Sequence, residues 1–229
     1  MATRLLSQIK QRALSVYGGD TTRPRTILFG LNRGLRMSLD LTSGTQTYLG
    51  IAERELFPYF FELSRDIRTA LDVGGSVGLY TLFLLKKTPA TRVICFEPEA
   101  SGFRTIAENL ELNGLTGDPR LELVNKFVDS KDDEQHVSLD SLADGIVGPC
   151  LVKIDVEEAE VDVLAGASRL IPRRDVRWII ETHTADIEKH CLSVFQNAGR
   201  TPQIVDKAWW RAVVPELRPA PHNRWLIVR

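Results

Sequence analysis

An acidic residue directly precedes a cluster of glycines in the segment LDVGGSVGLYT, which spans residues 71–81. Asp72 lies two residues before Gly74 and Gly75, and Gly78 completes the cluster. Glycine-rich turns of this kind follow a strand and let the backbone approach a nucleotide, often at a phosphate. A fixed negative charge would repel a phosphate, so Asp72 indicates a ligand whose nearby end is cationic.

A second acid, Glu97 in the segment CFEP, follows Asp72 by 25 residues, the length of one strand–helix–strand unit. At the end of the next strand, its carboxylate can hold both hydroxyls of a ribose. Together the two acids favour S-adenosyl-L-methionine, with its cationic sulfonium and ammonium groups, over NAD. Gly75 also comes one place early for the G-x-G-x-x-G fingerprint of dinucleotide sites. The alternatives are a helix cap for Asp72, a surface acid for Glu97, and an NAD-dependent oxidoreductase for the whole chain.

Three further side chains at strand ends are candidates for catalysis. Asp155 ends the segment KID, and Glu181 and His183 stand two apart in WIIETH, so they face the same way on an extended strand. His183 is the first candidate for a general base, because imidazole titrates near neutral pH. Asp155 would orient the acceptor hydroxyl or the cofactor amine. The alternatives are a backbone hydrogen bond for His183 and a helix cap for Asp155.

Asp155, Glu181 and His183 could also hold a divalent cation with their oxygen and nitrogen atoms, but we expect no metal there. Other polar and aromatic residues are candidates for contact with the acceptor. Packing in the core or at an oligomer contact explains them equally well. They are Tyr48, Glu53 and Arg54 in the N-terminal segment, Trp209 and Trp210 near the C-terminus, and His222 as a second candidate base.

Strand and helix patterns alternate from residue 69 onward, which predicts an α/β fold with a doubly wound, mostly parallel sheet of seven strands. Such a sheet binds its ligand at the carboxyl ends of the strands, where these candidate residues lie. The predicted strands are 69–75, 92–98, 120–128, 150–156, 176–183, 202–206 and 224–228, and the predicted helices are 77–87, 100–114, 158–170 and 185–199.

The first 68 residues have a different pattern and form an N-terminal extension to the domain predicted at 69–229. Apolar spacing over 3–16 predicts a helix, and 26–49 predicts a β-hairpin with its turn at 32–34. A helix at 53–65 would contain Pro58 at or near a kink. We expect this extension to act as a lid over the site or as a packing element.

The composition indicates a globular protein without a general affinity for polyanions. The 229 residues include 29 basic and 30 acidic ones, so we expect neither nucleic acid nor membrane as a partner, and a homo-oligomer is possible. Cys95, Cys150 and Cys191 are expected to be buried thiols. No signal peptide or membrane span is evident, so a cytoplasmic location is expected.

Five segments, in order, resemble the FkbM-type S-adenosylmethionine-dependent methyltransferases: DVGGSVGLYT, CFEPEASGFRTIAENLELN, VSLDSL, LVKIDVEEAEVDVLAGA and WIIETH. The resemblance covers roughly residues 26–228, and its most specific part is VKIDVE-x-AE-x-VL-x-GA. It implies a Rossmann-like class I methyltransferase fold and methyl transfer to a hydroxyl of a sugar, glycan or natural product. By position, the implied cofactor-binding residues are Asp72, Gly74, Gly75, Gly78, Glu97, Pro98 and Asp155, with Asn125 and Val128 near the adenine.

Two positions depart from the family pattern. Gly75 and Ser76 replace a small residue and an Asn in the glycine turn, which removes a side-chain amide from the cofactor site. Glu158 replaces the glycine of KIDVEG. Glutamate disfavours the backbone angles that glycine permits, so we expect a changed loop after Asp155. A non-catalytic partner subunit that retains the cofactor fold is therefore an alternative function.

Overall fold

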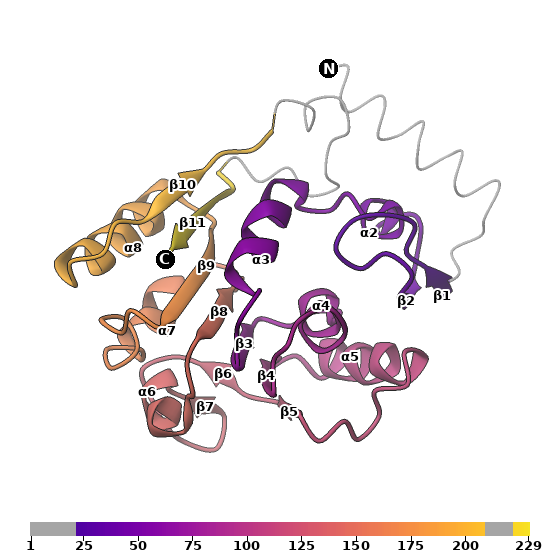
Figure 1. Ribbon diagram of the computed structural model, residues 1–229, viewed down its shortest axis with the longest axis horizontal. Coiled ribbons are helices and arrows are strands. Elements are labelled where there is room, and N and C mark those ends of the chain that lie inside the picture. Colours follow the sequence, from indigo (N-terminus) through magenta and orange to yellow (C-terminus); the bar gives the residue numbers. More distant parts are fainter. Residues whose placement is uncertain (1–21, 209–221) are drawn as a thin grey trace.

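The computed structural model describes residues 22–208 and 222–229. Its centre is a seven-stranded sheet, made of β3 (Thr69–Val73), β4 (Arg92–Phe96), β5 (Leu121–Val124), β8 (Cys150–Ile154), β9 (Val176–Thr182), β10 (Gln203–Val205) and β11 (Arg224–Val228). The strand order is β10-β11-β9-β8-β3-β4-β5, and only β11 runs antiparallel to its neighbours (Figure 1). The predicted α/β fold with a mostly parallel sheet of seven strands is confirmed.

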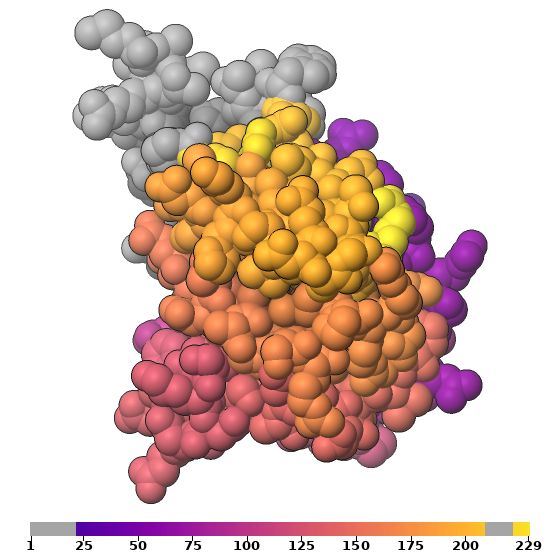
Figure 2. All heavy atoms as spheres, turned by 90° about the vertical axis from the view of Figure 1, so that its left-hand side faces the viewer, coloured from indigo at the N-terminus to yellow at the C-terminus, as the bar shows by residue number. Residues whose placement is uncertain are grey.

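Helices cover both faces of the sheet, as a buried parallel sheet requires. One face packs against α3 (Phe57–Leu63), α4 (Leu79–Lys87) and α5 (Ala100–Leu112), and the other against α6 (Leu139–Leu142), α7 (Glu160–Ala165) and α8 (Ala185–Asn197). Every residue of β3 and β8 is buried. Figure 2 shows the second face from outside, where the orange and gold atoms from α7 to β10 form a continuous cover.

The chain changes direction across the sheet between β3 and β8. From β3 it proceeds through β4 to β5 on one side, and it then returns to β8 beside β3 and proceeds to β9. A crevice forms at the carboxyl ends of the strands where the order reverses. The turn after β3 and the end of β8 therefore form opposite walls of one site.

The N-terminal segment packs on the side of α4 and α5. The predicted hairpin is present but shorter, with β1 (Arg23–Thr26) paired to β2 (Arg36–Leu39). It is followed by α2 (Thr45–Leu49) and the 3₁₀ turn η1 (Arg54–Leu56). Pro58 lies in the first turn of α3, which tolerates proline, so it marks the start of that helix and not a kink within one. The predicted helix at 3–16 lies outside the described residues.

The region between β5 and β8 contains more structure than the pattern predicted. The predicted strand 120–128 divides into β5 and β6 (Phe127–Val128), and β6 pairs with β7 (His136–Val137) in a separate small sheet. The 3₁₀ turn η2 (Ala143–Gly145) follows α6. The three cysteines are buried thiols, as predicted. Among the helices of the described residues, none has the length and apolar character of a membrane span.

The loop between β8 and α7 contains Glu158, and the predicted difference of this loop from that of the family stays a prediction. Glu158 has a φ of 64°, in the left-handed region that glycine favours. The amide of Asp155 donates to the carbonyl of Val73 at 3.0 Å, so the start of the loop is fixed on β3. The loop must then turn sharply into α7, and this outweighs a cost of about 1–2 kcal/mol for a side chain in that conformation. Glu158 is therefore a strained residue at this position.

Because glycine adopts this conformation without strain, we expect Glu158→Gly to raise the free energy of unfolding by about 1 kcal/mol. Urea unfolding followed by circular dichroism measures the change. Glu157→Gly is the matched control, because Glu157 does not have a positive φ and glycine there only adds flexibility, which lowers stability. A lower stability of Glu158→Gly would show that the glutamate side chain makes contacts worth more than the strain.

Candidate functional site

A cavity of about 610 Å³ opens at the carboxyl ends of β3, β4 and β8. This volume is typical of small-molecule sites. Its wall combines the glycine turn, the acid at the end of β4, the β6 strand and the loop after β8. The lining residues that concern its chemistry are Gly74, Ser76, Glu97, Pro98, Phe127, Val128, Asp155 and Glu157.

The glycine turn is fixed by backbone contacts to both neighbouring strands. The amides of Gly74 and Gly75 donate to the carbonyl of Phe96 at 3.0 and 2.9 Å. Gly74 has a φ of 82°, and a Cβ atom there would lie 2.0 Å from the carbonyl oxygen of Asp155. Gly78, also at positive φ, is the N-cap residue of α4. Glycine at position 74 is therefore required by the close approach of β3 and β8.

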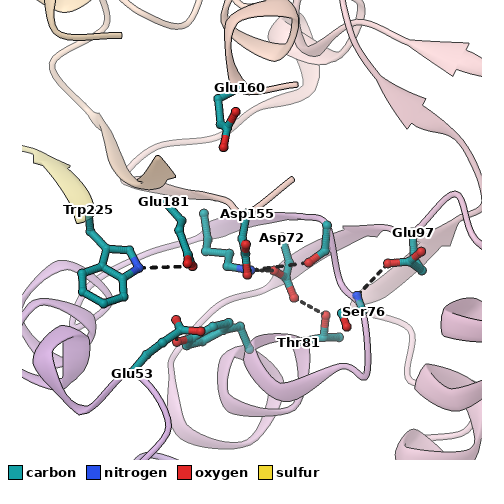
Figure 3. Close-up of polar contacts among 12 residues, drawn as sticks. Glu53, Asp72, Ser76, Thr81, Glu97, Asp155, Glu160, Glu181 and Trp225 are labelled. Carbon is teal, nitrogen blue, oxygen red and sulfur yellow. Dashed lines mark hydrogen bonds and ion pairs between the residues drawn. The ribbon is translucent and has the colours of Figure 1, made fainter. Parts of the chain in front are cut away.

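Glu97 presents a buried carboxylate that two backbone amides fix in place. Ser76 donates to one oxygen at 2.7 Å and Glu99 to the other at 2.8 Å (Figure 3). The side-chain amide of Asn125 donates to the carbonyls of Glu97 and Pro98 at 2.8 and 2.9 Å, so it stabilises the loop that carries the acid. Each carboxylate oxygen keeps a lone pair for a ligand hydroxyl.

Asp72 is buried behind the glycine turn and is partly neutralised by a lysine. It accepts a hydrogen bond from Thr81 at 2.6 Å, and the Lys153 ammonium lies 3.8 Å from its other oxygen (Figure 3). Lys153 also contacts Asp155 at 3.0 Å and lies over the ring of Tyr80. Burial raises the pKa of the Asp72 carboxyl, and Lys153 opposes this rise. A cationic ligand in the cavity would therefore meet Asp155 directly, with Asp72 behind it.

The structure brings the three candidate catalytic residues together. Nδ1 of His183 lies 2.5 Å from Glu160, and Nε2 lies 3.9 Å from both Asp155 and Glu181. The alternative considered for His183 was a hydrogen bond to the backbone, but Nδ1 contacts the side chain of Glu160 instead. Asp155 pairs with Lys153, whereas α7 begins after Ala159 without a side-chain cap. The catalytic roles of these residues stay predictions.

Glu181 is a buried acid in a negatively charged environment. Trp225 donates to it at 3.2 Å (Figure 3), and Asn223 donates to it at 2.5 Å. Burial, with the charges of Asp155 and Glu53, raises the pKa of the Glu181 carboxyl to about 10. The Glu181 carboxyl is therefore more readily protonated than an ordinary glutamate.

The candidate cation ligands are close but are not arranged as a magnesium site. The ligand atoms of Asp155, Glu181 and His183 lie within 4.8 Å of one another. Neighbouring ligands of an octahedral Mg²⁺ ion, with bonds of about 2.1 Å, are roughly 3 Å apart. The 3.9 Å distances from Nε2 are wider than this. The expectation that no metal binds to these residues stays a prediction.

Of the candidates for acceptor contact, Glu53 reaches the site, where it accepts a hydrogen bond from the hydroxyl of Tyr80. Tyr48 lies beside Arg25 on the N-terminal segment, and Arg54 belongs to η1. His222 lies 3.4 Å from Glu188 of α8. Trp209 and Trp210 lie outside the described residues.

Sequence reasoning missed Glu160, Asn223 and Trp225 as partners of the candidate catalytic residues. For Glu160 a signal was present. It stands three and four residues before the buried Val163 and Leu164, so it lies on the apolar face of α7. An acid on a buried face requires a partner, because an unpaired buried charge is costly. Asn223 and Trp225 contact Glu181 across 42 and 44 residues of sequence, and no local pattern indicates this.

Comparison with known proteins gives the family of the chain. The Methyltransferase FkbM domain matches residues 53–207, which is more than half of the chain. A crystal structure of Methyltransferase FkbM from Methylobacillus flagellatus KT is 18% identical with a TM-score of 0.54, over 71% of this chain and 43% of that one. The curated "Methyltransferase 1" of Beauveria bassiana (strain ARSEF 2860) is 36% identical over 47 residues, 20% of this chain and 19% of that protein.

Other solved methyltransferases share the fold. Precorrin-6y C5,15-methyltransferase from Geobacter metallireducens GS-15 is 12% identical with a TM-score of 0.52, over 79% of this chain and 88% of that one. M. jannaschii TYW2 in complex with AdoMet is 15% identical with a TM-score of 0.50, over 93% and 85%. This chain spans less than half of the FkbM structure and about a fifth of the curated relative. On the family match, this chain belongs to the FkbM methyltransferase family.

Proposed function

We propose that this protein transfers the methyl group of S-adenosylmethionine to a hydroxyl oxygen of a sugar, glycan or natural product. The observation that carries the proposal is the fixed Glu97 carboxylate on the wall of a cavity bordered by a glycine turn. Membership in the FkbM family supports methyl transfer, and AdoMet is named with a structure of the same fold. The NAD-dependent oxidoreductase has no comparable support.

The residues of the cavity fit this cofactor. Gly74 and Ser76 of the glycine turn line the cavity, so the turn can contact a ligand directly. Glu97 would accept hydrogen bonds from the two ribose hydroxyls, and these are strong because the acceptor is charged. Phe127, which is 48% exposed, and Val128 offer an apolar wall for the adenine. One carboxylate oxygen of Asp155 contacts Lys153, and the second oxygen would face the cationic end of the cofactor.

When bound, the cofactor supplies an electrophilic methyl group on a sulfonium. The protein must then align the acceptor oxygen and remove its proton. Nε2 of His183 would take this proton, and Asp155, 3.9 Å away, would stabilise the imidazolium. A base at this place favours a hydroxyl acceptor, because a hydroxyl must lose its proton as the new bond forms.

We also propose that residues 22–68, the described part of the N-terminal extension predicted at 1–68, form the acceptor side of the site next to the domain at 69–229. Glu53, through its bond to Tyr80, brings this segment to the candidate catalytic residues. The alternative function, a non-catalytic partner subunit, was suggested by Glu158 in place of the family glycine. That function becomes an outcome of the turnover experiment below.

Loss of the Glu97 carboxylate should weaken the cofactor complex. We expect Glu97→Ala to bind S-adenosylhomocysteine roughly ten-fold or more weakly, because charge-assisted hydrogen bonds to the ribose are lost. Isothermal titration calorimetry measures the affinity, and a thermal melt checks the fold. Glu108→Ala, at an exposed position of α5, is the control. Unchanged affinity in Glu97→Ala would place the ribose elsewhere.

Loss of the candidate base should slow turnover and leave cofactor binding intact. We expect His183→Ala to reduce methyl transfer by about 10²–10⁴-fold, the usual contribution of a general base. Radiolabelled S-adenosylmethionine with a panel of glycosides and polyols measures transfer, and calorimetry measures cofactor affinity. His190→Ala, at an exposed position of α8, is the control. Full activity of His183→Ala would remove it as the base, and a wild type that binds the cofactor without transfer would favour the partner subunit.

A further inference from the structure

The imidazole of His183 lies against a second acid, Glu160, to which the proposed function assigns no role. Glu160 is the first residue of α7 and is completely buried. One of its oxygens lies 2.5 Å from Nδ1 of His183. In Figure 3 it lies apart from Asp155, on the side away from Glu53. The two nitrogens of the imidazole therefore face different groups, Nδ1 the buried acid and Nε2 the candidate catalytic acids.

The burial of Glu160 determines which nitrogen of His183 holds a proton. Its second oxygen accepts no hydrogen bond from any described residue. A buried carboxylate costs several kcal/mol unless a donor or a cation compensates it. The N–H of Nδ1 is the donor in reach, so Nδ1 keeps its proton whether the imidazole is neutral or charged. The nitrogen that gains and loses a proton is then Nε2.

The surroundings of Nε2 leave it open toward the site. Asp155 and Glu181 are both 3.9 Å away, which is longer than a hydrogen bond. The charged groups that act on the imidazole are Glu160 from α7, Asp155 and Glu157 from the loop after β8, and Glu181 from β9. The hydrogen bond to Glu160 is the main cause of a raised pKa of His183, and burial opposes it.

We infer that Glu160 is a positioning residue that fixes the Nδ1–H tautomer of His183 and directs the lone pair of Nε2 to the acceptor hydroxyl. The catalytic part of this inference rests on the proposed function. A lone pair of the acceptor oxygen would form the O–CH₃ bond while the S–C bond of the cofactor breaks and its electron pair stays on sulfur. The proton of the acceptor hydroxyl would move to Nε2 of His183. The Glu160 carboxylate then stabilises the imidazolium, which later releases this proton to solvent.

The tautomer is measured without turnover by long-range ¹H–¹⁵N spectra of the histidine rings in the full chain. We expect neutral His183 to be protonated at Nδ1, with its signals assigned by their loss in His183→Gln. In Glu160→Gln, the amide group can donate to Nδ1, so we expect a shift to the Nε2–H tautomer and a lower pKa. Glu160→Asp keeps the charge and should keep the tautomer.

The matched control is Asp133→Asn, since Asp133 contacts Nδ1 of His136 at 2.8 Å on an exposed loop. This variant should change only the His136 signals. An Nε2–H tautomer of His183 in the wild type, or an unchanged tautomer in Glu160→Gln, would overturn the inference. The wild-type spectrum alone tests which nitrogen of His183 is protonated, even if Glu160→Gln does not fold.

Kinetics test the link to catalysis. We expect Glu160→Gln to lower kcat by about 10² or more, with Glu160→Asp partly active and cofactor affinity unchanged. The base acts when Nε2 is unprotonated, so activity rises with pH through the pKa of His183. Because Glu160 raises this pKa, the acid limb should move to lower pH in Glu160→Gln. If the acid limb of the pH profile does not move in Glu160→Gln, the positioning role of Glu160 is overturned. If His183→Ala is fully active while wild-type His183 is protonated at Nδ1, only the role of His183 as the base in the proposed function is overturned.

Discussion

The site depends on one buried cation, the ammonium of Lys153, and on the two acids that compensate its charge. Lys153 lies within β8, 3.8 Å from Asp72 of β3 and 3.0 Å from Asp155. Asp72 and Lys153 are also register partners in the parallel pair of strands. A displacement of one strand would leave a buried charge unpaired, at a cost of several kcal/mol. The ion pairs therefore favour the strand register that aligns the glycine turn with the loop after β8.

This pairing also sets the charge of the two ends of the cavity. Lys153 partly neutralises Asp72 and holds one oxygen of Asp155, so the other oxygen of Asp155 can act on a ligand. Beyond it lie two further acids, Glu53 and Glu181, and burial together with the charges of Asp155 and Glu53 raises the pKa of Glu181. Arrival of a cationic cofactor would lower that pKa again, because an opposite charge favours the ionised form. Cofactor binding and the protonation of the acceptor side are thus coupled through charge.

Much of the fold was predictable because the apolar strands are regular and each ends in a residue of distinct chemistry. Asp72, Glu97 and Asp155 are placed at one edge by topology alone, since parallel strands share their carboxyl ends. The break after Val124 coincides with the polar Asn125 and Lys126, which the prediction of a single strand over 120–128 did not treat as an interruption. The conformation of Glu158 was not predictable. There the loop imposes a backbone that the residue itself disfavours.

The difference between predicted and unpredicted contacts follows the two halves of the site. The proposed cofactor half is built from backbone amides and short segments, such as the contacts of Ser76 and Glu99 with Glu97, so local motifs describe it. The acceptor half is built from side chains of distant elements, such as Asn223 with Glu181 and Glu53 with Tyr80. Its shape can change by single substitutions that leave the motifs intact. A family can therefore keep one methyl donor and vary the acceptor, and this is why the cofactor is easier to infer than the acceptor.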